Sequence, residues 1–105
     1  MRVYIAGPYT LGDRSENVRT AAAAMMRILD AGHEPFCPIV HSHFLDLMHP
    51  RPWDDWMRLD LAWLPFAEAV IRLPGKSEGA DIECAAIAGT IPIFFSVEAF
   101  LEYAG

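Results

Sequence analysis

Residues 69–89 read AVIRLPGKSEGADIECAAIAG, and this stretch decides the fold class. The apolar run at 69–73 predicts a buried strand, which Pro74 and Gly75 end with a turn. Ser77 then stands at the N-cap of a helix expected to reach residue 88. A strand that leads directly into a helix is typical of parallel sheets covered by helices. The stretch therefore predicts an α/β protein.

The remaining chain repeats the alternation of strand and helix. Three further strands are expected, at residues 3–6, 34–40 and 92–95. Three further helices are expected, at about 13–32 with Asp13 or Ser15 as cap, 52–64 and 97–103. Residues 41–52 are expected to form a polar loop, and two prolines place strand 34–40 near a sheet edge. The sequence predicts one domain, 1–105, with a Rossmann-like three-layer α/β/α arrangement around a four- to five-stranded parallel sheet.

The composition limits the class of protein. Apolar residues make up 53% of the 105 residues, an excess that favours a homodimer or higher homo-oligomer. No run approaches the ~18–20 apolar residues that span a bilayer, and the start lacks the apolar region of a signal peptide. Cys37 and Cys84 show neither a disulfide framework nor a metal-binding spacing. A cytoplasmic protein with no membrane partner is therefore expected.

The net charge of −6 bears on the partner. A nucleic-acid polymer is not expected, because binding its phosphates needs a basic surface. A small phosphorylated ligand is compatible with this charge, since backbone amides at a helix start can hold a phosphate. Ligands of open parallel sheets bind beyond the carboxyl ends of the strands, which selects the loops 7–15, 41–52 and 74–79.

Glu83 is a candidate nucleophile. Helical side chains lean toward the N-terminus, so Glu83 is expected to project over Gly79 and Ala80, where the backbone is bare. A carboxylate in that position has room to approach a sugar carbon. The alternative interpretation is that Ser77 only caps the helix, Gly79 is incidental and Glu83 is a solvated charge.

Asp60 is a second candidate acid. It shares a helix face with Trp56 and with Trp63 or Leu64. An acid in such an apolar stripe is expected to have a raised pKa, which suits a general acid. Alternatively, Asp60 is paired with Arg58, Arg72 or a backbone amide. Two carboxylates directed at one sheet edge, ~5–9.5 Å apart, are the pair of catalytic groups that cleave glycosidic bonds.

Other chemical groups have weaker patterns. The run His41, His43, Asp46 and His49 matches no strong zinc spacing, so no metal is expected. Cys84 has no assignable activating base.

Several aromatic side chains have two interpretations each. Tyr4 is a core residue, or its hydroxyl reaches a catalytic carboxylate at the functional end of its strand. Trp53, Trp56 and Trp63 are core or interface residues, or one of them stacks on a base.

These residues together resemble the nucleoside 2-deoxyribosyltransferase superfamily, which includes the 2'-deoxynucleoside 5'-phosphate N-hydrolases. The resemblance lies in Tyr4 of VYIAGPYT, Asp60 of DLAWL and the run Ser77-x-Gly79-x-x-x-Glu83. The first third of the chain is also similar to small bacterial and phage proteins of this superfamily. The match covers nearly the whole chain, with the motifs in the same order.

The resemblance implies a role for each of these residues. Glu83 would attack C1' of a deoxyribose, Asp60 would act at the leaving base as acid or orienting group, and Tyr4 would position Glu83. Ser77 matches the serine that the monophosphate hydrolases keep for the 5'-phosphate, where the transferases have aspartate. The remaining phosphate-cradling residues implied are Gly7, Pro8, Tyr9, Thr10 and Gly79.

The resemblance therefore implies an N-glycosidase that hydrolyses the base–sugar bond of a (deoxy)nucleoside 5'-monophosphate. It implies no metal or organic cofactor, and a site completed between subunits. Base exchange by a transferase is the enzymatic alternative, and a non-catalytic nucleotide-binding or sensing module is the other. A cytokinin-activating phosphoribohydrolase fits less well, because PGKSEGADIE lacks the second glycine and the threonine of its PGGxGTxxE turn.

Overall fold

A four-stranded parallel sheet forms the middle layer of the protein, in a computed structural model that describes all 105 residues. The strand order is β2-β1-β3-β4. The strands are β1 (Arg2–Ala6), β2 (Glu34–Phe36), β3 (Ala69–Arg72) and β4 (Ile93–Phe94). The predicted parallel sheet, its strand count and the edge position of the proline-containing strand are confirmed.

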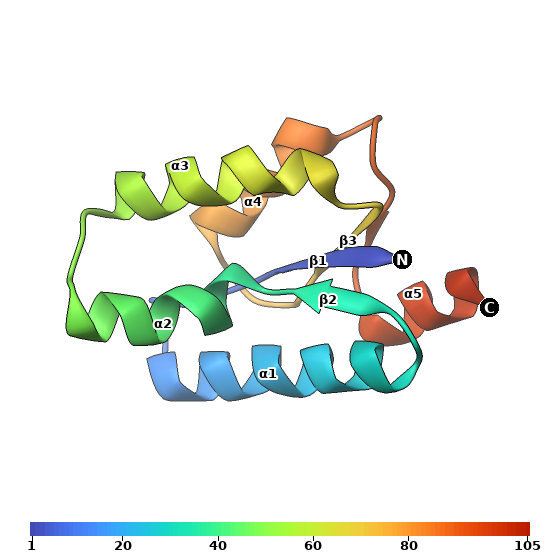
Figure 1. Cartoon of the computed structure of the whole chain (residues 1–105), viewed down its shortest axis with the longest axis horizontal. Helices are drawn as coiled ribbons and strands as arrows, with labels where there is room; N and C mark the ends of the chain where they lie inside the picture. The colour runs from blue at the N-terminus through green and yellow to red at the C-terminus, as the bar shows by residue number, and fades with distance from the viewer.

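Helices cover both faces of the sheet (Figure 1). The helical elements are α1 (Arg14–Asp30), α2 (Pro38–Met48), α3 (Trp53–Trp63), η1 (Leu64–Phe66), α4 (Glu78–Ile87) and α5 (Val97–Ala104). α1 and α5 pack on one face, whereas η1 and α4 pack on the other, where α3 also lies. The three-layer α/β/α arrangement predicted from the sequence is therefore confirmed.

The alternation of side chains along the strands divides the core in two. Val3 and Ile5 of β1 point toward α1 and α5, whereas Tyr4 and Ala6 point toward α4 and η1. All four are almost fully buried. Because neighbouring residues of a strand face opposite sides, Tyr4 is placed on the α4 face, the face that carries Glu83.

The predicted loop at 41–52 is wrong over most of its length, because residues 38–48 form α2. Pro38 occupies the first turn of this helix. Backbone N–H groups have no partner within the helix at that position, so the N–H that proline lacks is not needed. Ile39 and Val40 then pack against the core beside α1. The expected strand 34–40 is shortened to β2 for the same reason.

The helix caps follow the sequence. The Oδ1 atom of Asp13 accepts a hydrogen bond from the Glu16 amide at 3.1 Å and caps α1. The Oγ atom of Ser77 accepts one from the Ala80 amide at 3.1 Å and caps α4. Such caps contribute roughly 1 kcal/mol each. The start of α4 is thereby fixed at the carboxyl end of β3.

The outer surface has two further features. None of the helices has both the length and the hydropathy that a membrane crossing requires. Phe44, Leu47 and Met48 of α2 are each at least 60% exposed. Clustered exposed apolar side chains of this kind are commonly covered in subunit contacts.

Candidate active site

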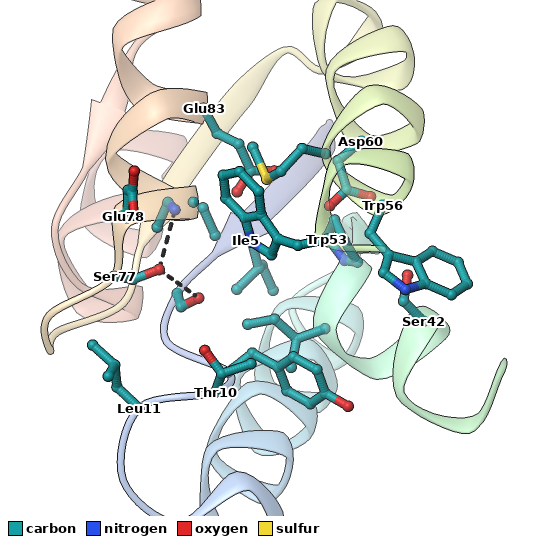
Figure 2. A pocket seen from close by; sticks show the side chains of 18 of the residues that line it. Ile5, Thr10, Leu11, Ser42, Trp53, Trp56, Asp60, Ser77, Glu78 and Glu83 are labelled. Atoms are coloured by element: carbon teal, nitrogen blue, oxygen red, sulfur yellow. Dashed lines mark hydrogen bonds between the residues drawn. The ribbon is translucent and has the colours of Figure 1, made fainter. Parts of the chain in front are cut away.

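A cavity of about 260 Å³ opens at the carboxyl edge of the sheet. Its walls come from the loop after β1, from α2, from α3 and from the start of α4. Figure 2 shows side chains from these elements converging on one space. Loop 74–79, the loop after β1 and residues of 41–52 were the positions selected from the sequence, and each contributes to the wall.

Glu83 lies inside the protein and not in solvent. It stands in the second turn of α4, is 6% exposed and lines the cavity. The hydroxyl of Tyr4 on β1 donates a hydrogen bond to the Oε2 atom of Glu83. The interpretation of Glu83 as a solvated surface charge is therefore wrong. Tyr4 lies beneath the carboxylate, outside the cavity lining.

Asp60 reaches the same cavity from α3. The ion pairs that the sequence suggested for it are absent. Arg58 lies 3.9 Å from Asp55, and Arg72 lies 3.0 Å from Asp81, so each guanidinium faces another carboxylate. Asp60 is half-buried without a cation of its own. The structure thus brings the two candidate acids into one partly apolar space.

Burial governs the acidity of both carboxyls. Desolvation raises the pKa of Asp60 to about 6, as its apolar surroundings predict. Desolvation likewise raises the pKa of Glu83 to about 7, with the Tyr4 hydrogen bond opposing the rise and the Asp60 charge adding to it. Burial and the Glu83 charge raise the pKa of Tyr4, which stays a neutral donor. Near neutral pH both carboxyls therefore lie close to the midpoint of their titration.

The start of α4 offers hydrogen-bond donors to the cavity. Ser77 uses its Oγ atom for the cap and also donates to the Gly7 carbonyl at 3.4 Å (Figure 2). The amides of Glu78 and Gly79 donate to no group within the chain. Free amides at the positive end of a helix dipole suit an anion such as a phosphate.

Gly79 has a packing role that the sequence did not reveal. A Cβ atom there would lie 3.3 Å from the Met57 sulfur and 3.8 Å from the Trp53 ring. The open side of Gly79 therefore faces α3, so the glycine is not incidental. Its missing side chain allows Trp53 and Met57 to approach α4.

The loop after β1 contributes unevenly to the cavity. Gly7, Tyr9 and Thr10 line it, whereas Pro8 does not. Pro8 packs instead on Gly75, where φ is +113° and a Cβ atom would lie 2.7 Å from the Pro8 ring. Only glycine fits that turn. Pro8 therefore supports the loop from behind the cavity.

The histidines and Cys84 do not form a site of their own. The His41 ring bonds to the Cys37 carbonyl at 2.8 Å, and the His43 ring bonds to the Tyr9 hydroxyl at 2.7 Å. No three histidine, cysteine, aspartate or glutamate side chains gather in a metal-binding cluster. Burial raises the pKa of the Cys84 thiol, which disfavours the reactive thiolate.

The comparisons with known proteins bear on this site and fold. The profile of a family described as "Domain of unknown function (DUF1937)" matches residues 1–94. The chain belongs to this family. No curated protein matches the sequence.

The fold of this family member is similar to that of a solved structure. The structure is that of a 2-deoxyribosyltransferase from the psychrotolerant bacterium Bacillus psychrosaccharolyticus, characterised as a biocatalyst for synthesis of antiviral and antitumoral nucleosides. The similarity has a TM-score of 0.58 at 18% identity and covers 89% of this chain and 69% of the other. The family member therefore has a nucleoside 2-deoxyribosyltransferase-like fold, as its sequence motifs predicted.

The sequence predicted only part of the cavity wall that α3 forms in this family member. Trp53, Trp56, Met57 and Asp60 of α3 all line it. These positions are spaced i, i+3, i+4 and i+7, so a search for that spacing would have found them. Of the two residues offered for the end of the apolar stripe, Leu64 is buried, whereas Trp63 is 59% exposed and lies beside Phe66.

Proposed function

We propose that this protein is an N-glycosidase that hydrolyses the base–sugar bond of a deoxynucleoside 5'-monophosphate. One observation carries the proposal: Glu83 and Asp60 line the same cavity, and the Tyr4 hydroxyl holds the Glu83 carboxylate. The fold relationship to a 2-deoxyribosyltransferase supports the same class of chemistry. Two carboxyl groups with different surroundings are what cleavage of a glycosidic bond requires.

In the first step, an oxygen of Glu83 attacks C1' of the sugar while the bond from C1' to the base nitrogen breaks. The electron pair of that bond leaves with the base, and Asp60 supplies the proton that the base takes up. Tyr4 stabilises the charged form of Glu83 by its hydrogen bond. The pKa of Glu83 given above includes the charge of Asp60. Once Asp60 is protonated that contribution disappears, so Glu83 more readily carries the charge.

In the second step, water attacks C1' of the glycosyl-enzyme and releases deoxyribose 5-phosphate and the free Glu83 carboxylate. Asp60, which has lost its proton to the base, accepts one from the water. Both groups return to their starting states, and no cofactor is consumed. A second base in place of water would give base exchange, the reaction of a transferase.

The phosphate is proposed to bind at the start of α4. The amides of Glu78 and Gly79 have no hydrogen-bond partner within the chain and are available to a ligand there. Lys76 lines the same end of the cavity. Ser77 holds the loop after β1 next to α4 through the Gly7 carbonyl. This arrangement supports a 5'-phosphate more than a free 5'-hydroxyl, because unpaired donors bind an anion strongly.

The proposal is tested by incubating the protein with each of the four deoxynucleoside monophosphates and separating the products by chromatography. Free base together with deoxyribose 5-phosphate is the expected result. Formation of a new nucleotide on adding a second base would indicate a transferase instead. Nucleotide-induced thermal stabilisation without any base release would contradict catalysis and favour a binding module.

Replacing Tyr4 by phenylalanine is expected to reduce kcat about tenfold, because a hydrogen bond to a charged group contributes roughly 1.5–3 kcal/mol. Without the hydroxyl, the pKa of Glu83 should rise further, since the Tyr4 hydrogen bond lowers it more than the Arg72 charge does. The acidic limb of the pH–rate profile should therefore move to higher pH. An unchanged limb with a reduced Tm would mean that Tyr4 acts only in packing.

Replacing Ser77 by aspartate is expected to change the preferred substrate. Aspartate is as good an N-cap as serine, so α4 should keep its stability. Its charge would repel a phosphate at the helix start, and KM for the monophosphate should rise at least about tenfold. KM for the corresponding nucleoside should change little. Equal losses for both substrates would show that the phosphate lies elsewhere.

A further inference from the structure

Two of the cavity walls suit a flat heterocycle. Ile39 and Ser42 of α2 line one side, and Trp53 and Trp56 of α3 line another. Figure 2 shows Trp56 and Ser42 far from Ser77, at the other side of the cavity from the proposed phosphate position. A nucleotide with its phosphate at the start of α4 would place its base between these walls. Aromatic side chains stack on any of the bases, because every base has a flat π-face.

The ring of Trp56 is held by a residue outside the cavity. The indole Nε1 donates a hydrogen bond to the Oδ1 atom of Asp46 at 2.9 Å. The same oxygen accepts the Arg51 amide at 3.2 Å, and Asp46 does not line the cavity. Because an indole has a single donor, this bond restrains the rotation of the ring. The bond also joins α2 to α3 across the connecting turn.

The electrostatic surroundings keep Asp46 in the form that this bond needs. The Trp56 hydrogen bond and the Arg51 amide lower the pKa of Asp46 below its ordinary value, and the nearby side chains of Arg14 and His43 act in the same direction. The carboxylate is therefore charged at neutral pH. A charged acceptor makes a stronger hydrogen bond to N–H than a neutral one does.

We propose that Asp46 is a positioning residue that fixes Trp56 as the wall on which the substrate base stacks. The inference rests on the proposed function and names the part of that site that recognises the base. Asp46 touches no substrate and acts only through Trp56. Its substitution should therefore affect ligands that contain a base and spare those that lack one. A residue that merely ties α2 to α3 would affect both kinds of ligand.

The test compares Asp46→Ala with the unaltered protein, using the deoxynucleoside monophosphate that it cleaves best. KM is expected to rise about tenfold, the order of one lost base–aromatic stack, with kcat changed less than about twofold. Inhibition by deoxyribose 5-phosphate, which has no base, should stay unchanged. Asp46→Asn keeps an acceptor oxygen and should restore most of the affinity.

Two further variants complete the design. Trp56→Phe keeps an aromatic wall but lacks the donor, so it should show the defect of Asp46→Ala, and combining the two should add nothing. Asp54→Asn removes an equal charge from the exposed first turn of α3 and should leave KM unchanged.

The outcomes separate this inference from the proposed function. Unchanged nucleotide KM in Asp46→Ala, or equal losses for nucleotide and deoxyribose 5-phosphate, would overturn the positioning role while catalysis stands. If Asp46→Ala does not fold, unchanged nucleotide affinity in Trp56→Phe overturns it equally. If the unaltered protein neither cleaves nor binds any deoxynucleotide in calorimetric titration, the proposed function fails and the inference fails with it.

Discussion

Replacing Glu83 by glutamine is expected to abolish base release and at the same time to stabilise the fold. The amide cannot attack C1', so the rate should fall about 1,000-fold or more, as for loss of other catalytic nucleophiles. Glutamine has nearly the same shape and keeps an oxygen that can accept the Tyr4 hydrogen bond. Nucleotide binding should persist, which separates chemistry from binding. Chromatography of released base and calorimetric titration measure the two properties.

The stabilisation has a defined pH dependence. Because the pKa of Glu83 rises from 4.5 to about 7 on folding, its contribution to stability is fully present below pH 4.5 and is lost as pH rises through 7. That rise corresponds to about 3 kcal/mol. Glutamine avoids the buried charge but still loses water from its amide, so a gain of about 1–2 kcal/mol is expected at pH 8.

Thermal unfolding of the Glu83→Gln variant at two pH values checks this expectation. Tm should exceed that of the unaltered protein by about 5–10 °C at pH 8, and by much less at pH 5. Glu102→Gln on the exposed side of α5 is the matched control and should show no pH-dependent difference. A Glu83→Gln variant that is less stable at pH 8 would show that the charged carboxylate is well solvated in the folded state.

Replacing Asp60 by asparagine should slow cleavage about 100-fold or more, the usual contribution of a general acid. The loss should depend on the leaving group, because only a base that needs a proton needs Asp60. A purine monophosphate and its N7-methylated form make the comparison, since the methylated base leaves without protonation. The methylated substrate should be cleaved by the variant almost as fast as by the unaltered protein.

The same variant makes a second, independent prediction. In the proposed mechanism Asp60 must carry its proton, whose loss is favoured as pH rises above its pKa of about 6, so the basic limb of the pH–rate profile should disappear in Asp60→Asn. Equal slowing of both purine substrates would identify Asp60 as an orienting group instead of an acid. A basic limb that stays in place in the variant would contradict the role of Asp60 as the acid.

The sequence determined the arrangement of strands and helices because its signals are local. The apolar run at 3–6 predicted the strand that became β1, and the strand–turn–helix signals at 69–89 predicted where α4 begins. Ser77 was recognisable as a cap because a serine side chain bonds its own helix start. Interpretation failed at α2, where histidines and prolines suggested a loop although Pro38 can begin a helix.

Only the tertiary structure decided the environments of the acids. Glu83 and Asp60 are 23 positions apart on separate helices. The apolar stripe predicted that Asp60 is withdrawn from water, but no local signal predicts the burial of Glu83. The contacts of Gly79 with α3 and of Pro8 with Gly75 arise in the same way, from packing between distant segments. Hydrogen bonds within one helix turn depend on neighbouring residues, whereas burial and pKa depend on every element packed around a group. The sequence therefore determined which groups are present, and the packing of the layers decided what those groups can do.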